Sequence, residues 1–516
     1  MKAPSGVVLL APRIGPRRRI AVDVVASANL IGTLGKYLGL AALLPTFVAL
    51  WYGEPVWPFL AAGAITSGLG FVLERATAGT SARVGVREGF LVVAATWVFA
   101  AGFGALPYLF AGGDQLGRPL DAYFEAMSGF TTTGASVVTD FDDLSRSLAM
   151  WRQFTQWLGG MGIIVLALAV LPRLRVGGRQ LMESELPGPE IAQLSERIRT
   201  TAQRLWVLYV GLTAAEALAL AALGWLGVDD KMTPYQAIAH AFTTLPTGGF
   251  STQAGSVGAF SAAAQWVIAL FITVAGVNFA LLYRGLVRGR MGAFARDEEF
   301  GLYTALLIVA CVALTVQLWA YGIAEGEAAV RQGVFQAASI MTGTGYASTD
   351  FATWPVLCLL SLFALMFAGG SAGSTTGSIK VVRHLLMGKI LRRELDQTVS
   401  PEVVLPIRLN GRPVDERTLR AIASFILLYV GIWAVGASVI AIDAAITDVA
   451  VGTLDTLAIS AAALGNVGPS FGITGPMGSY APLGDVSTIT LIGLMWAGRL
   501  EIVPVVVLLT RHYWRL

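Results

Sequence analysis

The sequence has 516 residues, of which 55% are apolar and only 13% are charged, and its mean hydropathy is +0.67. Soluble globular chains have roughly 45–50% apolar and about 25% charged residues, so this chain cannot cover itself with a solvated surface and is predicted to be an integral membrane protein. The net charge of +3, with basic residues spread along several loops, argues against a nucleic-acid partner.

The N-terminal segment is basic, and the arginines between 13 and 19 interrupt its apolar run, so we interpret it as a cytoplasmic tail rather than a cleaved signal. Ten nearly uncharged stretches follow, and a membrane span needs roughly 20 such residues. They occupy residues 37–53, 55–73, 89–113, 153–172, 205–228, 241–283, 301–324, 351–379, 421–442 and 486–510. The turn at Gly53, Glu54 and Pro55 joins the first two stretches and predicts a helical hairpin.

The basic residues predict the orientation of the spans. Lys and Arg concentrate in alternate connections, at 1–19, 75–87, 173–204, 284–296, 380–420 and 511–515. Loops rich in Lys and Arg stay in the cytoplasm, so both termini are predicted to be cytoplasmic. Cys311 and Cys358 lie inside apolar stretches, which argues against a disulfide framework or a metal cluster.

The loops on the opposite side, from the third span onward, each contain a short helix-permissive segment that ends in glycine. The segments are DAYFEAMSGFTTTGAS (121–136), PYQAIAHAFTTLPTGGFS (234–251), GVFQAASIMTGTGYAS (333–348) and LDTLAISAAALGNVGPS (454–470). They align on Gly134, Gly249, Gly345 and Gly468, which are 115, 96 and 123 residues apart. The sequence therefore predicts four copies of one unit: a span, a short re-entrant helix, a glycine strand and a second span.

Such a unit has a physical use in a membrane. A segment of roughly 10–14 residues is too short to cross the bilayer, and the carbonyl end of its helix attracts a cation. Glycine tolerates a positive φ and close backbone approach, so four strands around one axis can replace the hydration shell of a monovalent ion with carbonyl oxygens. A single Thr-Thr-Thr-Gly run is more often a turn, but four aligned copies in equivalent loops favour an ion filter.

The stretch after the third segment contains a second glycine-rich element, GGSAGSTTGSIK, at 369–380. It lacks the Gly-Lys-Ser/Thr ending of a phosphate-binding loop. Its glycines and hydroxyls predict a break in the helix, which a membrane tolerates only against protein or water. A loop that blocks the pore and a packing kink are the two interpretations. Lys380 and Arg383 at its end are expected to snorkel to the cytoplasmic surface.

Two charged residues lie inside predicted spans. Arg499 is in the last one, where an arginine is costly unless it faces water or a partner. It either faces the ion path or pairs with an acid such as Glu501, although a residue two positions away points to a different face of a helix. Glu216 is alone in its span and is equally compatible with helix packing and with a functional role. The three histidines show no metal-ligand spacing.

These motifs resemble those of the Trk/Ktr/HKT superfamily of potassium transporters, and within it those of the bacterial Trk-type membrane subunit. The resemblance rests on MSGFTTTGAS (127–136), WRQFTQWLGGMGIIVLALAVLP (151–172), TTLPTGGFST (243–252), TGTGYASTDF (342–351), AGGSAGSTTGSIKV (368–381) and ALGNVGPS (463–470). It covers essentially the whole chain, and the hairpin at 37–73 is similar to one that Trk-type members carry before the first repeat.

In this family the backbone of each filter glycine and of the two residues before it lines the ion path. The resemblance thus implies potassium binding by Thr132, Thr133, Gly134, Thr247, Gly248, Gly249, Gly343, Thr344, Gly345, Asn466, Val467 and Gly468. A serine at the first glycine accompanies sodium selectivity in the family, so Gly134 favours potassium. The resemblance also implies an intramembrane gating loop at 369–380. The implied gating residues are Gly369, Gly370, Gly373, Gly377, Lys380 and Arg499.

The expected fold is an all-α polytopic membrane protein of four span–pore-helix–span repeats with pseudo-four-fold symmetry. A cytoplasmic tail with a transmembrane hairpin (1–80) is expected to precede repeats at 81–175, 200–290, 297–400 and 415–516. We expect a protein of the bacterial cytoplasmic (inner) membrane, in contact with lipid, with potassium as its substrate and with no catalytic site and no cofactor.

The resemblance also implies two kinds of protein partner. One is a second copy of the chain, in a homodimer. The other is a cytosolic ring of nucleotide-binding RCK-type regulatory subunits that respond to NAD or ATP. The basic loops at 173–204 and 380–420 are the expected contact with this ring, although attraction to the charged membrane surface explains these loops equally well.

Other functions remain open on the same sequence. Potassium uptake coupled to sodium or protons, and a channel that discriminates less between potassium and sodium, both fit the same scaffold. An alternating-access transporter with inverted repeats is disfavoured, because each repeat here begins and ends on the cytoplasmic side. A polytopic membrane enzyme needs a titratable or metal-binding cluster within its spans, and the sequence contains no such cluster.

Overall fold

The computed structural model describes residues 22–79, 85–111, 113–169, 191–401 and 405–515. Within these ranges the regular structure is helical, apart from one antiparallel hairpin of β1 (Arg408–Leu409) and β2 (Arg412–Pro413). Six of the described helices are long and apolar enough to cross a membrane, or eight when each of two bent helix pairs is counted as one span. The predicted class, an all-α polytopic membrane protein, is confirmed.

The N-terminal hairpin begins earlier than the apolar stretch at 37–53. The Asp23 carboxylate accepts a hydrogen bond from the amide of Ala26 at 2.9 Å and so caps the first helix. Gly32 and Gly70 allow the two arms to approach closely, since a Cβ atom at Gly32 would lie 2.9 Å from the carbonyl oxygen of Gly70. The elements are α1 (Val24–Leu38), the 3₁₀ turn η1 (Gly39–Ala42), α2 (Leu43–Tyr52) and α3 (Trp57–Ala76).

Four groups of elements follow in the same order: a long helix, a short helix, an extended segment and a second helix. The long first helices are α4 (Val86–Ala111), α10 (Ile191–Trp225), α15 (Glu298–Ala320) and α19 (Glu416–Thr447). The short helices are α6 (Pro119–Phe130), α11 (Pro234–Thr244), α16 (Gly326–Met341) and α20 (Thr453–Leu464). The second helices are α7 (Arg146–Ala169), α12 (Ala262–Ala275), α17 (Val356–Leu365) and α21 (Asp485–Arg499).

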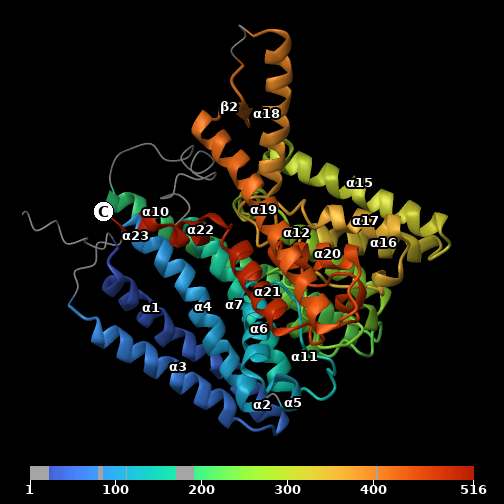
Figure 1. Cartoon of the computed structure of the whole chain (residues 1–516). Helices are drawn as coiled ribbons and strands as arrows, with labels where there is room; N and C mark the ends of the chain where they lie inside the picture. The colour runs from blue at the N-terminus through green and yellow to red at the C-terminus, as the bar shows by residue number, and fades with distance from the viewer. Residues whose placement is uncertain (1–21, 80–84, 112, 170–190, 402–404, 516) are drawn as a thin grey trace, which may run out of the picture.

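Shorter elements connect these groups, and one helix projects from the molecule. Figure 1 shows α18 (Val381–Val399) extending past the rest of the bundle, with β2 beside it. The remaining elements are α5 (Gly113–Leu116), η2 (Ser256–Ala259), α13 (Phe279–Leu282), the π-helical turn η3 (Tyr283–Val287), α14 (Gly292–Ala295), η4 (Phe351–Thr353), η5 (Gly472–Thr474), α22 (Val503–Leu509) and α23 (Arg511–Trp514).

Two of the second helices break sharply. The chain bends by 102° between α12 and the helical segment that starts at α13, and by 117° between α21 and α22. Asn278 starts α13 because its side chain accepts hydrogen bonds from two amides of that helix. At the other bend Glu501 and Ile502 have φ of 57° and 62°, which a right-handed helix cannot contain. The apolar stretches at 241–283 and 486–510 are therefore not continuous helices; each overlaps one of the two bent helix pairs, which count as one span each in the total of eight. The stretch at 351–379 holds only the 10-residue helix α17 before its irregular part.

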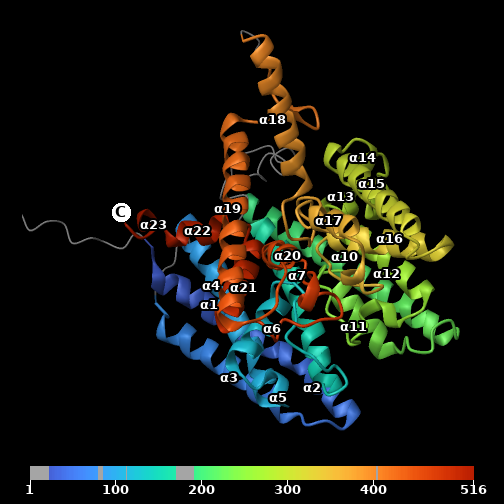
Figure 2. The same ribbon diagram turned by 45° about the vertical axis from the view of Figure 1, so that its right-hand side comes forward.

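Burial distinguishes the short helices from the long ones. In α20 every residue from Ala458 to Leu464 is buried. The long helices instead expose large apolar side chains such as Val207 (74%), Val309 (66%) and Leu427 (76%), as surfaces in contact with lipid do. Figures 1 and 2 show α1 and α3 along one side of the bundle and α15 and α16 on the opposite side. The C-terminal parts of the four short helices thus lie inside protein, where polar and irregular backbone is tolerated.

Candidate functional site

Each short helix ends in the same turn. In all four, the residue before the aligned glycine (Gly134, Gly249, Gly345 or Gly468) donates a hydrogen bond from its amide to the carbonyl five residues earlier. The pairs are Thr133–Ser128, Gly248–Thr243, Thr344–Ser339 and Val467–Ala462, with N–O distances of 2.9, 2.8, 2.8 and 2.8 Å. The four extended segments therefore begin with the same backbone geometry, although their sequences differ.

The extended segments also share an unusual backbone conformation. The second residue before each glycine has a positive φ, at Thr132 (51°), Thr247 (56°), Gly343 (73°) and Asn466 (53°). The aligned glycines also have a positive φ, at Gly134 (84°), Gly249 (74°), Gly345 (77°) and Gly468 (94°). A reversal of φ at every second residue lets a strand direct its successive carbonyls to one side. For a β-branched threonine this conformation is strained, and such strain concentrates at functional sites.

The four segments close into a ring in chain order. A Cβ atom at Gly134 would overlap the carbonyl oxygen of Gly248, and one at Gly249 would overlap that of Thr344. A Cβ atom at Gly345 would overlap the carbonyl oxygen of Val467, and one at Gly468 that of Thr133, which returns to the first segment. The structure thus brings together all twelve residues predicted for the filter. We call residues 132–134, 247–249, 343–345 and 466–468 the carbonyl ring.

Several carbonyls of this ring have no donor from the protein. Among the described residues, none donates a hydrogen bond to the carbonyls of Thr133, Thr344 or Val467, although all three residues are buried. Their counterpart in the second segment, Gly248, accepts from the Gln156 side chain at 2.7 Å. Buried carbonyls are nearly always satisfied, so the ring presents oxygens that a dehydrated cation would satisfy.

One side of the ring opens into a cavity of ≈ 280 Å³. Gly134, Gly249 and Gly345 line it, together with Pro469 from the fourth segment. Ser136 and Arg152 contribute to its walls. A solute that enters this cavity therefore meets three of the four glycines, and we call this side the mouth.

The loop 369–380 packs against the ends of the short helices next to the ring. The Thr375 hydroxyl donates to the carbonyl of Leu245, just after α11, at 2.9 Å. A Cβ atom at Gly377 would overlap the carbonyl oxygen of Gly465, just after α20. Gly370 also lies close to backbone, since a Cβ atom there would be 2.8 Å from the carbonyl oxygen of Gly276. Of the other predicted gating glycines, Gly369 and Gly373 have φ of 69° and 76°, which suits glycine.

Arg499 contacts this loop directly. Its side chain is 2% exposed, and it donates to the carbonyl of Thr375 at 2.8 Å and to the carbonyl of Gly159, on α7, at 3.3 Å. The arginine thus joins the loop of the third group to a helix of the first. No described carboxylate contacts Arg499; Glu501 pairs instead with Arg383. The alternative that Arg499 pairs with Glu501 is therefore wrong.

Lys380 and Arg383 do not reach the surface, contrary to expectation. Both residues are buried, at 6% and 8% exposure. The Lys380 ammonium donates to the carbonyl and the hydroxyl of Thr376, and the guanidinium of Arg383 lies 3.9 Å from the centre of the Phe425 ring. The loop and its neighbours supply acceptors for both cations, so snorkelling is unnecessary.

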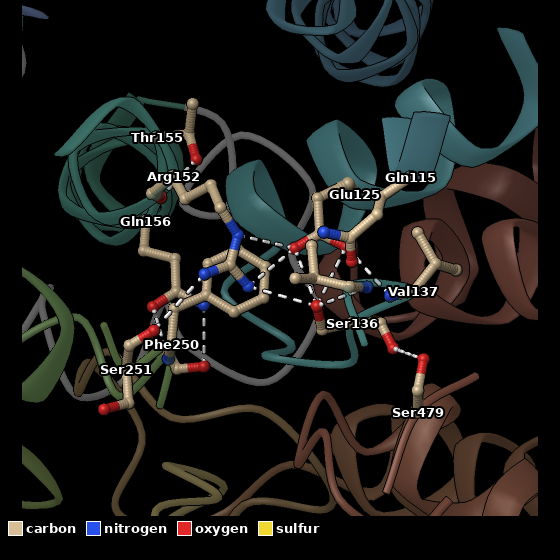
Figure 3. Close-up of polar contacts among 12 residues, drawn as sticks. Gln115, Glu125, Ser136, Val137, Arg152, Thr155, Gln156, Phe250, Ser251 and Ser479 are labelled. Carbon is tan, nitrogen blue, oxygen red and sulfur yellow. Dashed lines mark hydrogen bonds and ion pairs between the residues drawn. The ribbon is translucent and has the colours of Figure 1, made fainter. Parts of the chain in front are cut away.

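Other polar residues hold these elements in place and were not predicted from the sequence. The Glu299 carboxylate accepts hydrogen bonds from the amides of Ala372 and Val382, at 2.5 and 3.2 Å, on both sides of the loop's turn. Glu125 and Arg152 form a buried ion pair beside the strands that follow Gly134 and Gly249 (Figure 3). The available signal for Glu125 was an acid in the middle of the short helix-permissive segment at 121–136.

Glu216 makes no hydrogen bond to the ring or the loop, and the described residues offer no side-chain metal site. Glu216 is fully buried, and neither of its carboxylate oxygens has a hydrogen-bond partner among the described residues. In the described part of the chain, no three His, Cys, Asp or Glu side chains gather into a possible metal site.

The fold and the ring define a class of protein: a multi-pass membrane protein in which four short buried helices present backbone carbonyls around one axis. The family model of the cation transport protein TrkH matches residues 58–514. The chain is 36% identical over 494 residues to the Trk system potassium uptake protein TrkH of Salmonella typhimurium, covering 95% of this chain and 99% of that protein. It is 38% identical over 432 residues to TrkH of Escherichia coli K12, covering 83% and 86% of the two chains.

A solved structure of a protein with the same name as these relatives has a similar fold. The crystal structure of the potassium transporter TrkH from Vibrio parahaemolyticus matches with a TM-score of 0.85 at 32% identity, covering 96% of this chain and all of that one, 100%. The chain therefore belongs to the TrkH family of cation transport proteins. It is a bacterial Trk-type membrane subunit, and the family is one of transporters rather than enzymes.

Proposed function

We propose that the chain takes up potassium across the bacterial cytoplasmic membrane, with the carbonyl ring as its selectivity filter. The observation that carries the proposal is the closure of four left-handed glycine segments into one ring with buried carbonyls that lack donors. A potassium ion that has lost its water finds replacement oxygens there. The relatives named for potassium uptake support potassium as the ion, and Gly134 supports potassium over sodium.

We further propose that the loop 369–380 and Arg499 form the gate. The support is that the loop lies against the segments of the ring and that Arg499 holds the loop's Thr375 carbonyl to α7. A fixed positive charge beside the ion path repels a cation, in addition to the block by the loop backbone. Opening the gate then requires the loop to leave these contacts. Gly369, Gly370, Gly373 and Gly377 allow the loop its tight backbone path, and Lys380 fixes its end.

The same proposal sets the orientation and the assembly. The mouth faces the outside, and both termini lie in the cytoplasm, as the basic loops favour. The units are the tail and hairpin at 1–80 and repeats at 81–175, 200–290, 297–400 and 415–516. Two copies form a dimer, and an RCK-type ring of nucleotide-binding subunits docks on the cytoplasmic side, where α18 projects.

A less selective potassium and sodium channel is the second candidate, and one observation favours it. The ring is unequal, because the carbonyls of Gly248 and Gly468 accept side-chain hydrogen bonds from Gln156 and Tyr480, at 2.7 and 2.6 Å. Uneven field strength around an ion weakens discrimination by size. Symport of potassium with sodium or protons would use the same ring. In that case rubidium uptake depends on a sodium or pH gradient across the membrane.

Rubidium and sodium uptake in potassium-depleted cells tests the proposal. Gly134→Ser and Gly345→Ser are expected to reduce rubidium uptake, because any side chain there overlaps a neighbouring carbonyl. Unchanged rubidium uptake in both variants would contradict the filter. Deletion within 370–377 is expected to raise flux, and an unchanged or lower flux in correctly inserted protein would contradict the gate.

A further inference from the structure

The buried ion pair of Glu125 and Arg152 lies beside the strands that follow the first two segments of the ring. The Nε and Nη2 atoms of Arg152, on α7, are both 2.7 Å from Oε1 of Glu125, on α6. The two side chains are 1% and 0% exposed. A buried pair of this kind is weak evidence for stability, because apolar residues of the same volume are often no worse. Its contacts point to another role.

The pair joins the strand that follows Gly134 to the strand that follows Gly249. Glu125 accepts hydrogen bonds from the Ser136 hydroxyl and from the Val137 amide, both at 3.0 Å. Arg152 donates to the same Ser136 hydroxyl at 3.1 Å and, with Nη1, to the carbonyl of Ser251 at 3.3 Å. Figure 3 shows the guanidinium between these two strands. Its centre lies 4.2 Å from the centre of the Phe250 ring, which favours a cation there.

A second side chain of α7 extends this contact to the ring itself. Gln156 lies one helical turn after Arg152 and donates to the carbonyl of Gly248 at 2.7 Å. Its Oε1 accepts from the amide of Phe250 at 3.1 Å. The residues on both sides of Gly249 are thus tied to α7, and through Arg152 to the first segment.

The other repeats fasten their strands differently at the position of Glu125, nine residues before the glycine. His240 pairs with the Ser251 hydroxyl at 3.1 Å, and Gln336 donates to the carbonyl of Tyr346 at 3.0 Å. In the fourth repeat this position is Ile459, an apolar residue. Among the four residues, Glu125 is the only carboxylate. The ion pair is therefore a feature of the first repeat, where it also bridges to the second.

We propose that Glu125 and Arg152 are positioning residues that set how well the ring discriminates potassium from sodium. This proposal rests on the proposed function of the ring as a filter: the pair fixes the separation of the first two segments. Sodium is smaller than potassium and needs closer oxygens, so strands that can move toward each other admit it more readily. The discrimination between potassium and sodium thus depends on the spacing of the strands and not on the charge of the pair.

The ratio of rubidium to sodium uptake tests this distinction. Both ions carry one charge, so a purely electrostatic effect of Arg152, which lines the mouth, changes both rates by the same factor. Glu125→Gln weakens the pair, and Arg152→Lys keeps the charge but cannot donate to Glu125, Ser136 and Ser251 in the same fork geometry. Each variant is expected to lower the ratio by about tenfold.

Matched controls come from a second carboxylate–arginine pair on a short helix. Glu327 and Arg331 of α16 form an ion pair at 2.9 Å, but the Glu327 side chain is 58% exposed. Glu327→Gln and Arg331→Lys are expected to keep the ratio of the unaltered chain. Ser136→Ala removes the hydroxyl that both members of the buried pair share and changes neither charge, so it decides the test where the charge variants do not insert.

The outcomes separate the inference from the proposed function. An unaltered chain with no preference for rubidium over sodium overturns the proposed function and the inference together. A preference that survives in the buried-pair variants, or uptake of both ions that falls with an unchanged ratio, overturns the inference alone. Thermal melts of the purified protein give an independent measure, because an ion that binds the folded state raises its melting temperature. The extra protection by rubidium over sodium is expected to shrink in the variants.

Discussion

The carbonyl ring and the layer beside it, formed by the loop 369–380 and Arg499, are built in opposite ways. The ring uses backbone atoms, and its turn recurs four times with N–O distances of 2.8 or 2.9 Å. The layer uses one loop from the third group and one arginine from the fourth, and Arg499 donates to a carbonyl of the first group as well. Repetition is visible in the first region and absent from the second.

This difference has a physical reason. A hydrogen-bonded turn and a left-handed glycine depend on the backbone, so four sequences as different as TTG, TGG, GTG and NVG can adopt one geometry. A gate must have two arrangements of similar free energy. Side-chain contacts made by one loop and one cation can be broken individually, whereas each segment of the closed ring contacts its neighbours through the backbone. The predictions below test this contrast.

The largest effect is expected when a side chain is placed in the ring. In Gly345→Ala the new Cβ atom comes closer than 3.0 Å to the carbonyl oxygen of Val467, and the positive φ of 77° is strained as well. Strain of about 3 kcal/mol corresponds to a loss of rubidium uptake of roughly 100-fold. Gly431→Ala, on the open surface of α19 with nothing within 4 Å, is the control. Equal uptake by the two variants would show that the ring is not the path.

The second effect concerns Arg499, the arginine of the proposed gate. Arg499→Gln keeps a donor but removes the charge and one of the two contacts to backbone carbonyls. Hydrogen bonds to a charged group contribute about 1.5–3 kcal/mol, so the closed arrangement is expected to weaken and flux to rise by about tenfold. Rubidium uptake measured at equal protein in the membrane checks this. A fall in flux would mean that Arg499 supports the open path.

A smaller effect is expected at the other anchor of the loop. Glu299→Gln replaces the carboxylate that accepts the amides of Ala372 and Val382. The neutral amide oxygen accepts more weakly, by about 1 kcal/mol, and flux is expected to rise by several-fold at most. Glu298→Gln is the control, because the neighbouring carboxylate instead contacts Lys389 and the Asn410 amide away from the loop. The anchoring role fails if both variants behave alike.

The smallest effect is expected at a ring side chain that the backbone geometry does not need. Thr132 has a strained φ of 51°, and its hydroxyl has no hydrogen-bond partner among the described residues. Gly343 occupies the equivalent position of the third segment. In Thr132→Gly the relief of strain and the added freedom of the unfolded chain offset each other to within about 1 kcal/mol. Uptake is expected to change by less than about twofold; a large loss would show that the threonine side chain itself contributes to the ring.

Local patterns in the sequence were sufficient for part of this structure. The short segments around Gly134, Gly249, Gly345 and Gly468 were predicted as helix followed by glycine strand, and α6, α11, α16 and α20 end where these strands begin. Such features are local, because a short helix and a left-handed glycine are decided within a few residues. Their role in binding potassium stays a prediction.

The bends at Asn278 and Glu501 could not be found in the same way. Both lie in stretches apolar enough to be spans, and each bend depends on distant contacts. The carbonyl of Gly276 accepts the Ser371 amide at 2.9 Å, and Glu501 pairs with Arg383, 118 residues away in the chain. Hydropathy records the cost of leaving water but not which backbone groups find partners.

The sequence by itself therefore determined that this is a multi-pass helical membrane protein with four related segments of short helix and glycine strand, because composition and recurring glycine motifs are properties of the chain. The tertiary structure alone decided that these segments close into one ring in chain order. It also decided that Arg499 bonds to the carbonyl of Thr375 rather than to Glu501, and that Glu125 and Arg152 meet beside the strands that follow the first two segments. The physical reason is that a buried charge or carbonyl is costly without a partner, and for these groups the partner is a residue far away in the chain that only the fold brings close.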